Sequence, residues 1–254
     1  MTILRYHIAF GIVENPARVL SMPPASLQDG PILTPSLASF TSDTPALRLN
    51  SNGWMSLPAE VMATLRTHAA LKDYCRRRIE KKASIFDRPL QDFLTGYLDA
   101  VEAEVRDHAG GLPGGASWDA ALYAGADWFF SALLPLPNAH LELTGEEREA
   151  TGAERCIRFD VLFWTGTALV AVTLERLSMQ TSRQRQERAR FAALRPDIAF
   201  VTIPREQNRM RLQSHLPGVC GRFWRGLRYP LGPYRPDAFR WRPDAGPLSP
   251  ADER

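Results

Sequence analysis

Hydrophobic and polar positions follow a strand-like pattern at the start of the chain and then lose any regular period. Residues 3–13, ILRYHIAFGIV, are rich in β-branched and aromatic side chains and predict a strand. Residues 16–45 read as a long connection punctuated by Pro, Ser and Thr. Neither stretch contains a motif to which chemistry can be attached.

From Pro58 onward the apolar spacing becomes helical. It predicts two packed helices, over residues 59–83 and 88–111, with Pro89 in a first turn and Gly110-Gly111 as a stop. The first helix ends in a basic cluster, CRRRIEKKA, that can contact phosphates. A basic face near a helix C-terminus is also favoured electrostatically, and this structural interpretation ranks first.

The second half of the chain predicts a helix, three strands, a helix and a strand. The expected ranges are a helix over 117–135, strands over 139–145, 156–164 and 167–176, a helix over 182–194 and a strand over 197–204. Ser117 can cap the first helix, and Thr181 with Gln184 fits a capping box for the second. Residues 146–155 are expected to form a polar loop. The last strand is almost continuously apolar, which is typical of a strand in a sheet interior.

The hairpin RFDVLFWTGTALVAVTLER carries an acid near each outer end, Asp160 and Glu175. A turn at Thr165-Gly166 would set Asp160 opposite Ala171, leaving Glu175 roughly 13 Å farther along at ~3.3 Å per residue. A turn at Gly166-Thr167 would instead set Asp160 opposite Thr173 and bring Glu175 to the diagonal position. A three-residue loop would place the acids on opposite faces. The turn therefore decides whether the two carboxylates can share an ion.

Composition narrows the protein class only slightly. The chain has 254 residues, 44% of them hydrophobic, and its three cysteines have no partner Cys or His at a metal-binding spacing. The sequence has no apolar run long enough to cross a membrane and no signal-peptide pattern, so a cytoplasmic location is the default expectation. Of the 31 basic residues 28 are arginines, which cannot readily replace a lysine in proton transfer.

Basic charge is concentrated toward the C-terminus. Residues 181–254 hold 15 arginines against 7 acids. Such a balance favours nucleic acid as a partner, although solvated arginines explain it equally well. We divide the chain into an N-terminal strand, long loop and helical region (1–112), an α-β-β-β-α-β core (113–205) and a basic extension rich in proline and aromatic residues (206–254).

The order of elements from about Ser117 to Pro204 resembles the PD-(D/E)XK, or restriction-endonuclease-like, nuclease superfamily. The resemblance implies an α/β fold with a mixed central sheet flanked by helices, here with a helical N-terminal region. It also implies a Mg²⁺ or Mn²⁺ ion held by carboxylates, because hard divalent cations prefer oxygen ligands and activate water for phosphodiester hydrolysis.

The resemblance is carried over residue by residue. Asp160 takes the place of the family's strand aspartate. If Glu175 is the second acid, Leu177 occupies the lysine position. If Thr173 replaces the second acid, Glu175 takes the lysine position. The implied site therefore consists of Asp160 and Glu175 as metal ligands, with Thr173 or Gln180 positioning water or phosphate.

Other residues contribute less specific signals. The resemblance implies backbone contacts from the arginines of the following helix: Arg183, Arg185, Arg188 and Arg190. Asp119 or Asp127 can add an acid from the first helix. His140 and His215 are treated as structural.

Three functions remain open. The first is a nucleic-acid-binding protein, for DNA or RNA, with metal-dependent hydrolysis. The second is a catalytically inactive nuclease-like fold that serves as an assembly or adaptor protein, with a protein partner or as a homo-oligomer. The third is an unrelated enzyme whose site lies between the helical region and the sheet, which a pocket away from Asp160 would favour.

Overall fold

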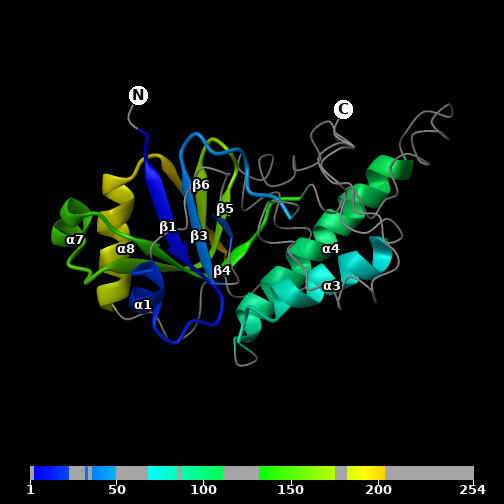
Figure 1. Cartoon of the computed structure of the whole chain (residues 1–254), viewed down its shortest axis with the longest axis horizontal. Coiled ribbons are helices and arrows are strands. Elements are labelled where there is room, and N and C mark those ends of the chain that lie inside the picture. Colours follow the sequence, from blue (N-terminus) through cyan, green and yellow to red (C-terminus); the bar gives the residue numbers. More distant parts are fainter. Residues whose placement is uncertain are drawn as a thin grey trace.

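The computed structural model describes residues 3–22, 32–33, 36–49, 68–84, 87–110, 132–174 and 182–203. They form an α/β structure around one mixed sheet (Figure 1). None of the helices in these ranges is long and apolar enough to cross a membrane.

The sheet has seven strands in the order β2-β3-β1-β4-β5-β6-β7. The strands are β1 (Arg5–Ala9), β2 (Ile32–Leu33), β3 (Leu37–Thr41), β4 (Leu136–Glu142), β5 (Cys156–Trp164), β6 (Leu169–Leu174) and β7 (Ile198–Ile203). All neighbouring pairs are antiparallel except β6 and β7, which are parallel. The predicted α/β class with a mixed sheet is confirmed.

Helices lie on both sides of the strands. They are α1 (Pro16–Leu20), α3 (His68–Glu80), α4 (Arg88–Gly110), α7 (Gly145–Thr151) and α8 (Ser182–Leu194). Figure 1 shows α7 and α8 to the left of the sheet and α3 with α4 to the right. β5 matches its predicted range, α4 begins at Arg88 as predicted, and α8 ends at Leu194 as predicted. Gly111 of the predicted Gly-Gly stop lies outside the described residues.

The N-terminal strands belong to the same sheet as the second half of the chain. β1 pairs with β3 on one side and with β4 on the other. The interpretation of residues 16–45 as a connection is therefore wrong for α1, β2 and β3. The five residues of β3, LASFT, pair along the whole length of β1. A strand this short is defined by its non-local partner more than by its own composition.

Two further local predictions are wrong. The polar loop expected over 146–155 is wrong for residues 146–151, which belong to helix α7. The helix forms because Thr144 caps it and exchanges reciprocal hydrogen bonds with Glu147. β7 is the outermost strand of the described sheet and not an interior one, and its Phe200 is 37% exposed. The expected helix over 117–135 and the caps at Ser117 and Thr181 lie outside the described residues.

The hairpin of β5 and β6 adopts the second of the two registers considered. Val161 pairs with Val172 and Trp164 with Leu169, so the turn residues are Gly166 and Thr167. Gly166 has φ +88°, and a Cβ there would lie 2.9 Å from the backbone nitrogen of Ala46. Glycine satisfies both requirements because it has no Cβ.

Aromatic side chains tie the hairpin to its surroundings. Trp164 is 1% exposed, packs 5.3 Å from Tyr6 between ring centroids, and donates its indole N–H to the carbonyl of Thr44. Phe163, on the other side of the strand, packs 5.1 Å from Tyr97 of α4. β5 is accordingly buried from Phe159 to its end.

An ion-pair network joins α7 and the start of β7 to β1. Arg195 contacts Glu147 at 2.9 Å and Asp197 at 2.8 Å, and its guanidinium lies over the ring of Tyr6. The hydroxyl of Tyr6 donates to Asp197 at 3.3 Å. These contacts hold the end of α8 against the sheet.

Candidate functional site

Asp160 lies where the β5–β6 pairing ends, and its carboxylate extends the connection between the strands. The last paired residues before it are Val161 and Val172. One of its carboxylate oxygens, Oδ2, accepts the backbone N–H of Leu174 at 2.7 Å, and the residue is only 4% exposed. The side chain thus supplies the acceptor that a strand carbonyl would otherwise provide.

Asp160 also marks a change of side along β5. Phe159, just before it, packs 6.1 Å from Phe191 of α8. Phe163, four residues later, packs against Tyr97 of α4. Residues an even number apart share a face in a regular strand, yet α8 and α4 lie on different sides of the sheet (Figure 1). The strand is therefore irregular at Asp160.

The neighbouring strand is irregular at the same level. The β4–β5 pairing passes over Asn138 and Asp160, and Asn138 has φ +48°. Asparagine adopts this left-handed conformation more readily than most residues. Its side chain accepts from Arg158 at 3.1 Å and donates to the carbonyl of Lys82 at 3.4 Å. The sequence offers no clear signal for this distortion.

Of the two predicted partners of Asp160 on the next strand, the structure describes Thr173 but not Glu175. Continuing the observed register by one residue places Thr173, which is partly exposed, opposite Asp160. The same register assigns Glu175 to the diagonal position, but Glu175 and Gln180 lie outside the described residues, as do Asp119, Asp127 and His215. Thr173 is therefore the one predicted partner whose position across from Asp160 is described.

The four arginines of α8 are not equivalent. Arg188 donates from Nε and Nη2 to the carbonyl of Arg158, at 3.2 and 2.9 Å, and its guanidinium lies 5.9 Å from the ring centroid of Phe159. These contacts engage it with β5. Arg190 is exposed. Arg183 and Arg185 belong to α8, but their side chains are outside the described part.

His140 and Cys156 form a half-buried pair on β4 and β5, with Nδ1 and Sγ 3.9 Å apart. Burial, reinforced by Arg158, lowers the pKa of His140 to about 4. Burial also raises the pKa of the Cys156 thiol, and nearby acids add to this. Both groups are neutral at pH 7, unlike the thiolate of a catalytic cysteine. The structural role predicted for His140 fits this environment.

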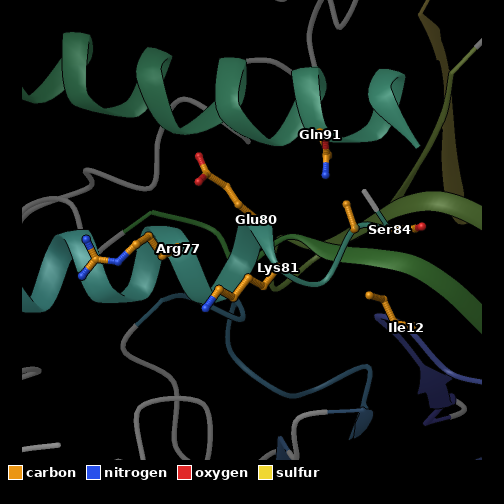
Figure 2. A pocket seen from close by; sticks show the side chains of 7 residues that line it. Ile12, Arg77, Glu80, Lys81, Ser84 and Gln91 are labelled. Carbon is orange, nitrogen blue, oxygen red and sulfur yellow. The ribbon is translucent and has the colours of Figure 1, made fainter. Parts of the chain in front are cut away.

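A separate pocket of about 360 Å³ lies between the end of α3, the start of α4 and the chain just after β1. We call it the α3–α4 pocket; it is lined by Ile12, Arg77, Glu80, Lys81, Ala83, Ser84 and Gln91. In Figure 2 Gln91 points from α4 into the space, and Arg77 and Lys81 extend along the α3 side. Its basic residues come from the cluster CRRRIEKKA. The sequence did not predict that this cluster lies beside Gln91 and Ile12, because their proximity depends on the fold.

Metal binding can be tested against the donors that are present. In the described residues no group of three or more His, Cys, Asp or Glu side chains could hold a metal ion. At the hairpin these residues supply one carboxylate, from Asp160, and one hydroxyl, from Thr173. Hard divalent cations accept both donor types, so the fit of the site depends on Glu175 as the second carboxylate.

The chain was also compared with known proteins. No family model, no curated protein and no solved structure matches it.

Proposed function

We propose that the β5–β6 hairpin carries a divergent metal-dependent site for nucleic-acid phosphodiesters, as in the PD-(D/E)XK superfamily that the sequence resembles. The observation that supports this most is the hairpin register. Of the registers considered, it is the one that puts Thr173 across from Asp160 and assigns Glu175 to the diagonal. Diagonal neighbours in a sheet are close enough for long side chains to meet.

In this proposal Asp160 and Glu175 hold one Mg²⁺ or Mn²⁺ ion. The bound ion would lower the pKa of a water molecule and neutralise charge that develops on the phosphate. A carboxylate has two oxygens with about four lone-pair directions, so the hydrogen bond from Leu174 is compatible with metal binding. Thr173 or Gln180 would position the water or the phosphate.

The nucleic-acid backbone would be bound by the arginines of α8. Arg190 is exposed, and Arg183 and Arg185 lie earlier on the same helix. Arg188 contributes less directly, because its guanidinium holds the carbonyl of Arg158. Contacts of this kind fix the backbone without reading sequence, so DNA and RNA are both substrates to test.

The test combines calorimetry and cleavage on the full chain. We expect saturable Mn²⁺ binding and Mn²⁺-dependent cleavage of labelled DNA or RNA, both lost in Asp160→Asn and Glu175→Gln. Asp73→Asn removes an exposed acid from α3 and serves as the matched control. Cleavage that persists unchanged in Asp160→Asn would contradict the site assignment.

A second candidate function is favoured by the environment of Asp160 itself. Its carboxylate completes the strand pairing at 4% exposure, a structural role that needs no metal. Leu177 stands where the resemblance expects a lysine. Both observations favour an inactive nuclease-like fold that acts as an assembly or adaptor protein. This alternative predicts that the protein does not bind Mn²⁺ saturably. It also predicts that the protein associates with itself or with a partner, and that Glu175→Gln leaves this association unchanged. Light scattering measures the association.

A further inference from the structure

The α3–α4 pocket contains two basic side chains that the fold itself does not use. Within the described residues, the guanidinium of Arg77 and the ammonium of Lys81 have no hydrogen-bond or ion-pair partner, and both residues are exposed. Their neighbour Arg76 contrasts with them, since it pairs with Glu80, Asp99 and Glu102. The last turns of α3 and the residue that follows the helix therefore carry one arginine paired within the fold, Arg76, and two cations without a partner in the described residues, Arg77 and Lys81.

Electrostatic attraction to the end of α3 explains only part of this arrangement. Cations near a helix C-terminus are favourable, and this accounts for basic residues in the last turn. It does not account for the concave space between them and α4, into which Gln91 points (Figure 2). A volume of about 360 Å³ is within the range of small-molecule sites.

Glu80 is the one acid among the described residues of the lining, and its charge is compensated inside the fold. Its carboxylate accepts from Nε of Arg76 at 3.2 Å and from the hydroxyl of Thr95 at 3.3 Å. Figure 2 shows it directed toward α4, whereas Lys81 extends the other way. The uncompensated charge around the pocket is therefore positive.

The start of α4 adds little to anion binding. Asp87 precedes the helix and accepts the N–H of Leu90 at 3.3 Å, and Pro89 has no N–H. The charged donors around the space are the side chains of Arg77 and Lys81, and Gln91 adds a neutral amide. Two cations beside neutral donors match a dianionic oxyanion better than a single carboxylate. Buried Ala83 and exposed Ile12 leave apolar surface for the body of a ligand.

We propose that the α3–α4 pocket binds a small phosphorylated molecule. Arg77 and Lys81, four residues apart at the α3 side, would hold its phosphate group, and the body of the molecule would lie in the space that Gln91 enters from α4. This site shares no residue with the hairpin, so it stands or falls independently of the proposed phosphodiester site. Its basic residues are exposed, and replacing them leaves the core intact.

The test uses inorganic phosphate as the probe and amide chemical shifts of the full chain as the readout. We expect saturable shifts centred on residues 77–91. The double substitution Arg77→Gln/Lys81→Gln should weaken phosphate binding by about 10- to 100-fold, because charge-assisted hydrogen bonds are among the stronger ones. Arg18→Gln/Arg88→Gln removes two exposed cations outside the lining and should leave binding within about twofold.

Three results would overturn the proposal. The first is the absence of saturable phosphate binding, and the second is equal binding by the Arg77→Gln/Lys81→Gln protein. The third is acetate binding as tight as phosphate binding, which would contradict the choice of a dianion. Circular dichroism of each variant confirms that it is folded before binding is compared.

Discussion

The β5–β6 hairpin and the α3–α4 pocket both contain charged residues that the sequence singles out. The charged residue of the hairpin is buried and hydrogen-bonded, whereas those of the pocket are exposed. In the hairpin Asp160 is 4% exposed and its carboxylate accepts a backbone N–H. In the pocket Arg77 and Lys81 are exposed, and their charged ends contact no other described side chain. The charged group of the hairpin therefore takes part in the hydrogen bonding of the fold, and the two cations of the pocket do not.

Burial therefore decides how much the position of a charged residue says about function. A buried charge must be satisfied by the protein, because desolvation without compensation costs several kcal/mol. Its geometry is therefore explained by stability whether or not it also binds a ligand. An exposed cation has no such requirement, so its position beside a concave surface carries more information about binding.

The largest expected effect comes from removing the buried carboxylate. Asp160→Ala should lower the free energy of unfolding by about 3 kcal/mol, because it leaves the buried N–H of Leu174 without its acceptor and creates a small cavity. Urea denaturation measures the change. Asp160→Asn keeps an oxygen that can accept the same N–H and should cost about 1 kcal/mol. If the alanine variant were as stable as the wild type, the carboxylate of Asp160 would not stabilise the fold, and the two regions would not differ in this respect.

Much of the fold around this hairpin could be predicted from local patterns. The limits of β5 and the end of α8 agree with the predictions, because apolar alternation and helical spacing are local signals. β3 was missed inside a connection, since its strand character comes from pairing with β1, more than 25 residues away in sequence. α7 was also missed, although Thr144 and Glu147 form a capping box that the sequence displays.

The candidate sites were less predictable than the fold. The sequence named Asp160 and Thr173 and restricted the hairpin to a few registers, but the turn depends on Gly166 packing against Ala46, a tertiary contact. The irregularity at Asn138 has no local signature. The pocket could not be predicted because the concave surface beside the basic cluster arises from the packing of α3 against α4.

The next prediction concerns the pH dependence of stability that arises from His140, on the strand next to β5. Burial lowers the pKa of His140 in the folded protein to about 4, from about 6.5 for an ordinary histidine. The unfolded chain therefore binds more protons between these values, so stability is fully present above pH 6.5 and is lost as pH falls toward 4. We expect a loss of about 1–2 kcal/mol after allowing for partial exposure.

His140→Gln provides the comparison. Because glutamine does not titrate, the difference in unfolding free energy between wild type and variant should change across this range and stay constant above pH 7. Chemical denaturation at a series of pH values gives both curves. Parallel curves would show that the imidazole is solvated like an exposed histidine, contrary to its half-buried position beside Arg158.

A smaller effect is expected from Arg76, the arginine of α3 that is paired within the fold. Arg76→Gln removes contacts with Asp99 at 2.5 Å, Glu102 at 3.0 Å and Glu80 at 3.2 Å. The arginine side chain is 20% exposed, so we expect a loss of about 1–2 kcal/mol, reduced at high salt. Urea denaturation at low and high ionic strength measures it.

The smallest effect on stability should come from the adjacent residue, and it gives the sharpest form of the comparison. Arg77→Gln removes an exposed charge that has no partner in the described part of the chain, so stability should change by less than about 0.5 kcal/mol. Phosphate affinity should nevertheless fall about tenfold, because this side chain is one of the two cations at the pocket. Arg76→Gln should show the reverse pattern, with lowered stability and nearly unchanged phosphate binding. If both variants lost stability equally, or neither lost affinity, the distinction between Arg76 and Arg77 would fail.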